Sequence, residues 1–187
     1  EADDSVAVKV FVEAGCPFCR AFLAGPLNQT LEAPGMMDII DLELSPFGNA
    51  YFRTSGQTCG GGADYDPDVR KCFNKACGLG ARHRPQECFK GDLVCQHGPA
   101  ECIANRYMAC AKRVTRAKPT VYMPFTTCFE ASWDRSRTEE AAWAELASTC
   151  ASVAGLENAQ LRSCYTGKQG FEAVVAEAEA TPEHPGV

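Results

Sequence analysis

Two cysteines stand three positions apart in EAGCPFCRAF, residues 13–22, between an apolar run and a segment of helical character. Cys16 and Cys19 at this spacing could alternate between two thiols and a disulfide, form a structural disulfide, or supply half of a zinc site. Pro17 suits the first position of a helix, where its missing N–H costs no hydrogen bond. The positive end of that helix favours the thiolate of Cys16, the form that attacks a disulfide.

A reversible redox pair is the interpretation that these residues favour. Cys19 lies one turn beyond Cys16, so we expect Cys16 to be exposed and Cys19 to be shielded. A structural disulfide across a helix start would restrict little of the chain. A zinc site needs two further ligands, whereas the chain has no second C-x-x-C and only three histidines, His83, His97 and His184. The C-P-F-C sequence also resembles the glutaredoxin type, but the glycine pair that holds glutathione there is missing.

The elements around the pair read as a strand, a helix and a strand. Residues 5–13 are β-branched and apolar on both faces, which predicts a central, buried strand. A helix follows Gly15 and ends near residue 25 or a little later, with Phe18, Phe22 and Leu23 as its inner face. Residues 37–45 alternate between apolar and acidic side chains, which predicts a second strand. Such a βαβ unit predicts two parallel strands joined by a right-handed crossover.

The rest of the chain divides into an irregular segment and a helical one. Residues 53–94 are rich in glycine and cysteine, and we expect a loop held by its own disulfides. From Pro99 onward apolar residues recur at helical spacing. The expected stripes run from Ile103 to Val114, from Trp143 to Cys150 after an N-cap at Thr138, from Leu156 to Tyr165, and from Phe171 to Ala178.

The chain has twelve cysteines in 187 residues, and this number limits the cellular compartments in which the protein could fold. Cytosolic glutathione keeps thiols reduced, so this number favours the secretory pathway, a lysosome or vacuole, or the cell exterior. Asn28 begins the triplet Asn-Gln-Thr and is a glycosylation candidate on that route. Ten cysteines remain beside Cys16 and Cys19 for structural disulfides of undetermined pairing: Cys59, Cys72, Cys77, Cys88, Cys95, Cys102, Cys110, Cys128, Cys150 and Cys164.

Charge and hydropathy exclude several classes of partner. The net charge of −6 and the pI of about 5.1 argue against a nucleic-acid partner. The basic run from Arg106 to Lys118 is interpreted as a solvated helix face. No apolar run approaches the roughly 18 residues that a transmembrane helix needs. The chain begins at Glu1 with no signal-peptide pattern, and we expect any such peptide to have been removed or left out.

Residues 95–110, CQHGPAECIANRYMAC, resemble the signature of the gamma-interferon-inducible lysosomal thiol reductase (GILT) family. EAGCPFCRAFL resembles the active-site stretch of that family, and LSPFGNA, residues 44–50, resembles its P-Y/F-G-N-A segment. The resemblance covers about residues 6–52 and 93–180. The matching signature positions are Cys95, Gln96, His97, Gly98, Glu101, Cys102, Asn105 and Cys110, and Cys128, Cys150 and Cys164 also fall where the family keeps cysteines.

The resemblance implies a thioredoxin-like fold with a helical insertion, which reduces protein disulfides at acidic pH. Cys16 would be its nucleophile and Cys19 its resolving cysteine. We expect the signature stretch to be structural, with His97 as a satisfied loop histidine rather than a titrating functional group. On a regular helix Cys102 and Cys110 lie about 12 Å apart along the axis, beyond the ~7 Å that a disulfide spans, so each must pair elsewhere.

Two departures from the family pattern are visible. Residues 53–94 are longer than the usual connection in the family. Their four cysteines, Cys59, Cys72, Cys77 and Cys88, suggest two disulfides within this segment, and we expect the segment to form a binding surface. The family continues beyond the point where this chain stops, with an active-site proline, two antiparallel strands and a helix. Pro124 is the only proline within the chain that we consider as a substitute for that active-site proline. We therefore expect the chain to be part of a longer gene product, with the C-terminal ββα elements absent.

These observations predict an α/β protein with a thioredoxin-like core. The expected parts are residues 1–52, the βαβ half with the C-x-x-C; residues 53–94, the Cys/Gly-rich insertion; residues 95–168, a helical insertion; and residues 169–187, a returning helix and tail. The expected function is thiol–disulfide exchange on disulfide-containing protein substrates, without a cofactor. The alternative is a catalytically silent subunit of a larger assembly, contacted through residues 53–94.

Overall fold

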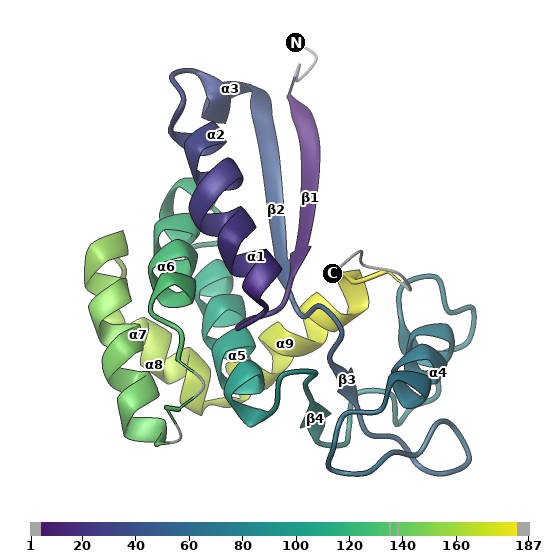
Figure 1. The fold of residues 1–187 in the computed structure, drawn as a ribbon. Helices are drawn as coiled ribbons and strands as arrows, with labels where there is room; N and C mark the ends of the chain where they lie inside the picture. The colour runs from purple at the N-terminus through teal and green to yellow at the C-terminus, as the bar shows by residue number, and fades with distance from the viewer. Residues whose placement is uncertain (1–4, 135, 138, 183–187) are drawn as a thin grey trace.

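The computed structural model describes residues 5–134, 136–137 and 139–182. The N-terminal part of the chain contains a parallel two-stranded sheet (Figure 1). Strand β1 (Val6–Val12) pairs with β2 (Ile40–Pro46), with Val6 opposite Ile40. The expected parallel pairing is therefore confirmed. Helical segments connect the strands: α1 (Pro17–Phe22), a π-helical turn (Leu23–Leu27), α2 (Asn28–Glu32) and α3 (Met36–Ile39).

Three local expectations for this unit are wrong. Strand β1 is not central, because within the described residues it pairs only with β2, and its Val6 side chain is 60% exposed. The second strand begins at Ile40, after the short helix α3. Phe18 and Phe22 do not form the inner face of the helix: they are 86% and 41% exposed, while Cys19 and Leu23 are buried. The apolar pattern alone could not tell an inner phenylalanine from one left on the surface.

The helical part of the chain packs beside α1 and β2 and encloses the main core. Tyr107, Phe129 and Trp143 from three helices pack against one another at its centre, with ring centroids 5.6 and 5.8 Å apart. The expected stripes therefore lie on helices, except that Leu156, the first residue of the third stripe, precedes the helix, which begins at Asn158. The helices are α5 (Pro99–Val114), α6 (Pro119–Ala131), α7 (Glu140–Ala154), α8 (Asn158–Thr166) and α9 (Lys168–Ala180). Thr138, the expected N-cap of the second stripe, lies outside the described residues.

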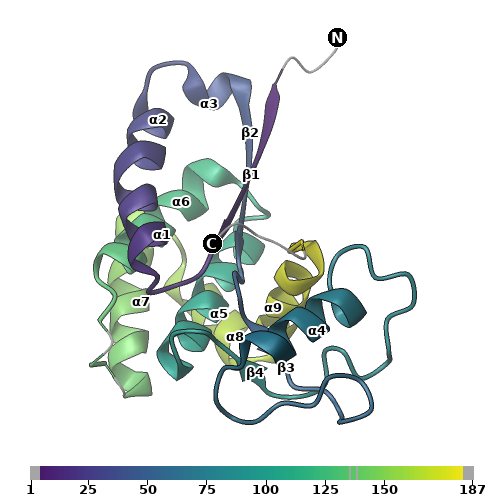
Figure 2. The ribbon, with the colours of Figure 1, turned by 45° about the vertical axis from the view of Figure 1, so that its right-hand side comes forward.

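Residues 53–94 are more ordered than the expected irregular loop. They hold α4 (Pro67–Cys77), whose N-cap Asp66 accepts hydrogen bonds from the backbone of Asp68 and Val69. Strand β3 (Tyr51–Phe52) precedes this segment and pairs antiparallel with β4 (Leu93–Val94), closing its base. Four phenylalanines form a second core that also contacts α9: Phe47, Phe52, Phe73 and Phe89. Figure 2 shows this segment beside α9.

Ten cysteines are joined in five disulfides, each linking neighbouring segments. Two of them lie within residues 53–94, as expected: Cys59–Cys72 and Cys77–Cys88. The others are Cys95–Cys102, Cys110–Cys164 and Cys128–Cys150. Cys102 and Cys110 thus pair with other segments, in agreement with the helix geometry. None of the described helices is long and apolar enough to cross a membrane.

Candidate active site

Cys16 and Cys19 are free thiols at the junction of β1 and α1. Cys16 is the N-cap of α1 in an extended conformation, Pro17 occupies the first helical position, and Cys19 follows one turn later. The backbone N–H of Arg20 donates to the Cys16 carbonyl at 3.0 Å, which starts the helix. The sequence therefore places the pair correctly on the local structure, at the end of a helix where unpaired N–H groups gather.

The expected difference in exposure between the two cysteines is wrong. Both side chains are buried, each at 6% exposure, and Phe18 between them is the side chain that faces solvent. Burial raises the pKa of Cys19 to about 12, and the neighbouring Cys16 adds to this effect. The Cys19 thiol is therefore strongly held in its protonated form.

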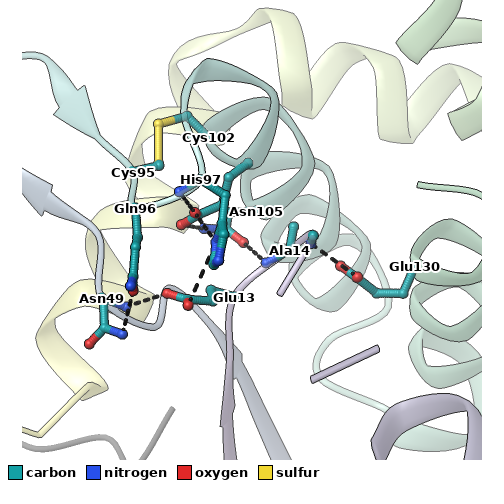
Figure 3. A network of polar contacts seen from close by, with 11 residues as sticks. Glu13, Ala14, Asn49, Cys95, Gln96, His97, Cys102, Asn105 and Glu130 are labelled. Atoms are coloured by element: carbon teal, nitrogen blue, oxygen red, sulfur yellow. Dashed lines mark hydrogen bonds and ion pairs between the residues drawn. A yellow bond between two sulfur atoms is a disulfide. The ribbon is translucent and has the colours of Figure 1, made fainter. Parts of the chain in front are cut away.

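A buried loop, Glu13–Ala14–Gly15, leads from β1 to Cys16, and each of its residues is held by a different part of the chain. The N–H of Ala14 donates to Asn105 Oδ1 at 2.9 Å, and the N–H of Gly15 donates to Glu130 Oε2 at 3.2 Å (Figure 3). Asn105 comes from α5 and Glu130 from α6. Two helices far along the sequence thus satisfy the buried N–H groups that lead to the thiol pair.

His97 lies between two buried carboxylates beside this loop. Its Nδ1 is 2.9 Å from Glu101 Oε2 and 3.7 Å from Glu13 Oε1, and its backbone N–H also donates to Glu101. Glu13 and Glu101 are 2% and 0% exposed. Burial raises the pKa of Glu13, and the charge of Glu101 raises it further. His97 was expected to be a satisfied loop histidine, and it is satisfied by Glu101, but its position within the cluster around Cys16 was not expected.

Asn49 closes the network from the other side. Its backbone N–H donates to Glu13 Oε2 at 2.9 Å, and its side-chain amide donates to Gln96 Oε1 at 2.7 Å (Figure 3). Gly48, with φ +54°, permits this approach, since a Cβ there would lie 2.5 Å from the Cβ of Glu13. The three stretches with recognisable motifs, residues 13–22, 44–50 and 95–110, therefore meet in one hydrogen-bonded network.

Glu130 is the functional candidate that sequence reasoning missed most clearly. It is 1% exposed, and its Oε1 has no hydrogen-bond partner among the described residues. Burial raises its pKa to about 7, while the Gly15 N–H acts in the opposite direction. Glu13 was also missed, although it directly precedes the loop of the C-x-x-C. For Glu130 the only signal was a carboxylate in an otherwise apolar helical segment.

The 53–94 segment also reaches the network. Arg70 on α4 is 4% exposed and donates through Nη2 to the carbonyl of Gly48 at 2.8 Å. Its charge lowers the pKa of Glu13, against the effect of burial. Burial lowers the pKa of Arg70 itself to about 10. This segment therefore places a buried cation beside the loop that carries the cysteine pair.

Glu13, Cys16 and His97 could together hold a metal ion. Their donor atoms all lie within 4.8 Å of one another, and this is the one such group of at least three residues in the described part of the chain. From the sequence, only cysteines and histidines were considered as further zinc ligands. The structure offers His97 and also a glutamate, Glu13. His83, by contrast, is exposed in the 53–94 segment, and His184 lies outside the described residues.

Two other candidates lie away from this network. Asn28 begins α2, where its Nδ2 donates to Glu32 at 2.9 Å, and it lines an apolar groove between α2 and α6. Pro124 lines the same groove from within α6. It therefore does not take the place of the expected proline beside the cysteines.

Comparisons with known proteins bear on this arrangement. Residues 7–154 match the family described as gamma interferon inducible lysosomal thiol reductase (GILT). GILT-like protein 2 of Drosophila melanogaster is 27% identical over 107 residues, which are 57% of this chain and 35% of that protein. GILT-like protein C02D5.2 of Caenorhabditis elegans is 23% identical over 180 residues, 96% of this chain and 43% of that protein. The chain spans less than half the length of these curated relatives.

Proposed function

The chain belongs to the gamma interferon inducible lysosomal thiol reductase family, and we propose that it is a thiol–disulfide oxidoreductase that reduces disulfides of protein substrates. The observation that carries the proposal is the state of the cysteines. Ten are paired with one another, and the two that remain as thiols lie one turn apart at the start of α1. The other residues of the network hold the loop on which this pair is mounted.

In the proposed reaction the Cys16 thiolate attacks one sulfur of a substrate disulfide. A Cys16–substrate disulfide forms and the other substrate sulfur leaves as a thiolate. The Cys19 thiol then attacks Cys16 Sγ and gives its proton to the departing substrate sulfur, which releases the second substrate thiol and leaves a Cys16–Cys19 disulfide. Two electrons pass to the substrate, and an external thiol returns the pair to its reduced form. The network provides fixed backbone positions around the reacting sulfurs.

The proposed fold is the first half of a thioredoxin-like core. Support comes from the parallel β1–β2 pair and from the position of the C-x-x-C between β1 and α1. We propose the same parts as in the sequence analysis: residues 1–52 for the βαβ half, 53–94 for the disulfide-bonded insertion, 95–168 for the helical insertion and 169–187 for the returning helix. The disulfides support an oxidising secretory or endolysosomal compartment, where Asn28 could be glycosylated.

One observation favours the second candidate, a catalytically silent subunit of a larger assembly. Both thiols are only 6% exposed, so a substrate sulfur has little direct access to Cys16 in this conformation. In that case residues 53–94, which pack on α9 through their own core, would be the contact surface. The reductase proposal instead requires the solvent side of the pair, around Phe18, to yield to a substrate chain.

Insulin reduction at about pH 5 by the full-length, correctly oxidised protein separates the two proposals. The wild-type protein should turn over, and Cys16→Ser should abolish turnover. Cys19→Ser should instead accumulate a covalent disulfide between Cys16 and the substrate, detectable by mass before and after reduction. Absence of turnover in a preparation whose mass shows two free thiols would favour the silent subunit.

A further inference from the structure

Glu13, Cys16 and His97 bring three kinds of metal donor into one small, buried space. They come from three segments: the end of β1, the N-cap of α1 and the turn between β4 and α5. Their donor atoms all lie within 4.8 Å of one another, so shifts of about 1 Å would bring them to the spacing of a coordinated ion. The Glu13 side chain is 2% exposed and that of His97 18%. Side chains this enclosed start with little rotational freedom to lose on binding.

The donor set suits zinc. Thiolate, imidazole and carboxylate are the three ligand types of protein zinc sites, whereas magnesium and calcium prefer oxygen alone. We propose that the reduced protein binds one Zn²⁺ through Glu13, Cys16 and His97, with a solvent molecule in the fourth position of the tetrahedron.

The surroundings of these donors match those of metal ligands. Glu101 Oε2 lies 2.9 Å from His97 Nδ1 and accepts a hydrogen bond from its N–H, as a carboxylate does when it orients a metal-binding imidazole, which leaves Nε2 as the nitrogen for the metal. The N–H of Asn49 holds one oxygen of Glu13, and its other oxygen faces His97. Two buried carboxylates, Glu13 and Glu101, therefore flank one imidazole. Arg70, which is bonded to the Gly48 carbonyl, offsets their negative charge from one side only. A Zn²⁺ ion between the donors would offset it directly.

Zinc binding and formation of the Cys16–Cys19 disulfide compete for Cys16 Sγ. The Cys16 thiol releases its proton when it coordinates Zn²⁺, and within the disulfide it has no thiolate to offer. The metal should therefore bind only the reduced pair and protect it from oxidation. Inhibition of disulfide reduction by Zn²⁺ follows as well, and this consequence rests on the proposed function, whereas metal binding itself does not.

Cobalt(II) is the probe for the test, because its spectrum reports the ligands directly. The protein is reduced only at Cys16 and Cys19, checked by mass, and titrated anaerobically with Co²⁺. One equivalent should produce a thiolate-to-cobalt charge-transfer band and the intense visible bands of a four-coordinate ion, and Zn²⁺ should displace both. Cys16→Ser, which removes the thiolate but no hydrogen bond of the network, should abolish the charge-transfer band.

His97→Gln and Glu13→Gln test the two other ligands, and the exposed His83→Gln is the matched control. Each ligand variant should weaken binding by at least about tenfold, as should Glu101→Gln, which leaves all proposed ligands in place. His83→Gln should bind like the wild type. Thermal melting establishes that each variant is folded, and Glu101→Gln remains as a test if a ligand variant is not.

Two results would overturn the inference. One is the absence of a charge-transfer band, and the other is equal affinity in the wild type, His97→Gln and Glu13→Gln, which would mean chelation by the cysteine pair alone. The fates of the two proposals are separable. Insulin reduction without cobalt binding would contradict the zinc site and support the reductase proposal. Cobalt binding without insulin reduction would support the zinc site and contradict the reductase proposal.

Discussion

Gly15 leaves no room for a side chain between the backbone and a tryptophan ring. Its φ is +76°, and a Cβ there would lie 2.4 Å from Cζ2 of Trp133, whose ring is 8% exposed and has Arg20 5.9 Å from its centroid. The position of Cys16, the next residue, therefore depends on a contact that only glycine permits.

Gly15→Ala should lower the free energy of unfolding by about 2–4 kcal/mol, because left-handed strain and overpacking against Trp133 add. Gly35→Ala is the matched control: its φ is +78°, but no atom lies within 4 Å of the added Cβ. We expect about 1 kcal/mol there, from strain alone. Denaturant unfolding followed by tryptophan fluorescence measures both. Equal losses in the two variants would mean that the Trp133 contact does not hold Gly15 in place.

At this scale the sequence predicted the position of the cysteine pair at a helix start but not its surroundings. Spacing and Pro17 placed Cys16 at a helix start, since both are local features. Gly15, the residue before Cys16, contacts Trp133 and Glu130, which lie more than a hundred positions away, and no local sequence pattern indicates these contacts. For the same reason His97 could be found as a candidate but not assigned to the site.

The next scale is that of the helices, and α5 shows how one element holds another. Glu101 and Asn105 are four residues apart, so they lie on the same face of α5 and meet at 3.4 Å. Together they contact His97 and the N–H of Ala14. Glu101 and Asn105 thus have a structural role at the loop before Cys16, whereas Cys110 of the same signature is bonded to Cys164 in the helical core.

Asn105→Ala should destabilise the protein by roughly 1–3 kcal/mol, because the buried N–H of Ala14 loses its acceptor. Hydrogen exchange at the Ala14 amide should accelerate as well. Asn158→Ala on α8 is the control, since that exposed side chain bonds only to Ser148 among the described residues and should cost within about 0.5 kcal/mol. Unchanged protection of the Ala14 amide would contradict the assigned role of Asn105.

Helices with an apolar repeat over several turns could be predicted from the sequence. Helix α4, which is marked mainly by its N-terminal cap, was overlooked. The stripes on α5, α7 and α9 repeat over several turns, which fixes a helix regardless of context. Helix α4 carries Asp66 and Pro67 at its start, a signal that glycines and cysteines on both sides obscured. The environment of β1 could not be predicted, because neighbouring strands decide whether a strand is central.

For the whole molecule, buried glutamates make stability depend on pH. Glu130 and Glu177 are 1% and 6% exposed, and burial raises the pKa of both, that of Glu130 to about 7. A group whose pKa is higher in the folded than in the unfolded state binds more protons when folded, so its contribution is complete below about pH 4.5 and is lost as pH rises through the folded pKa. The protein should therefore be more stable in mild acid than at neutral pH.

Glu130→Gln isolates this effect, because the amide keeps an acceptor for the N–H of Gly15 but cannot ionise. Between about pH 5 and pH 8 the wild type should lose roughly 2 kcal/mol of unfolding free energy through Glu130, and the variant should lose correspondingly less. Glu145→Gln, at an exposed position of α7, is the control and should follow the wild type. Denaturant unfolding at both pH values gives the comparison. Parallel pH dependence in wild type and Glu130→Gln would mean that the buried carboxyl is not the group that links folding to acid.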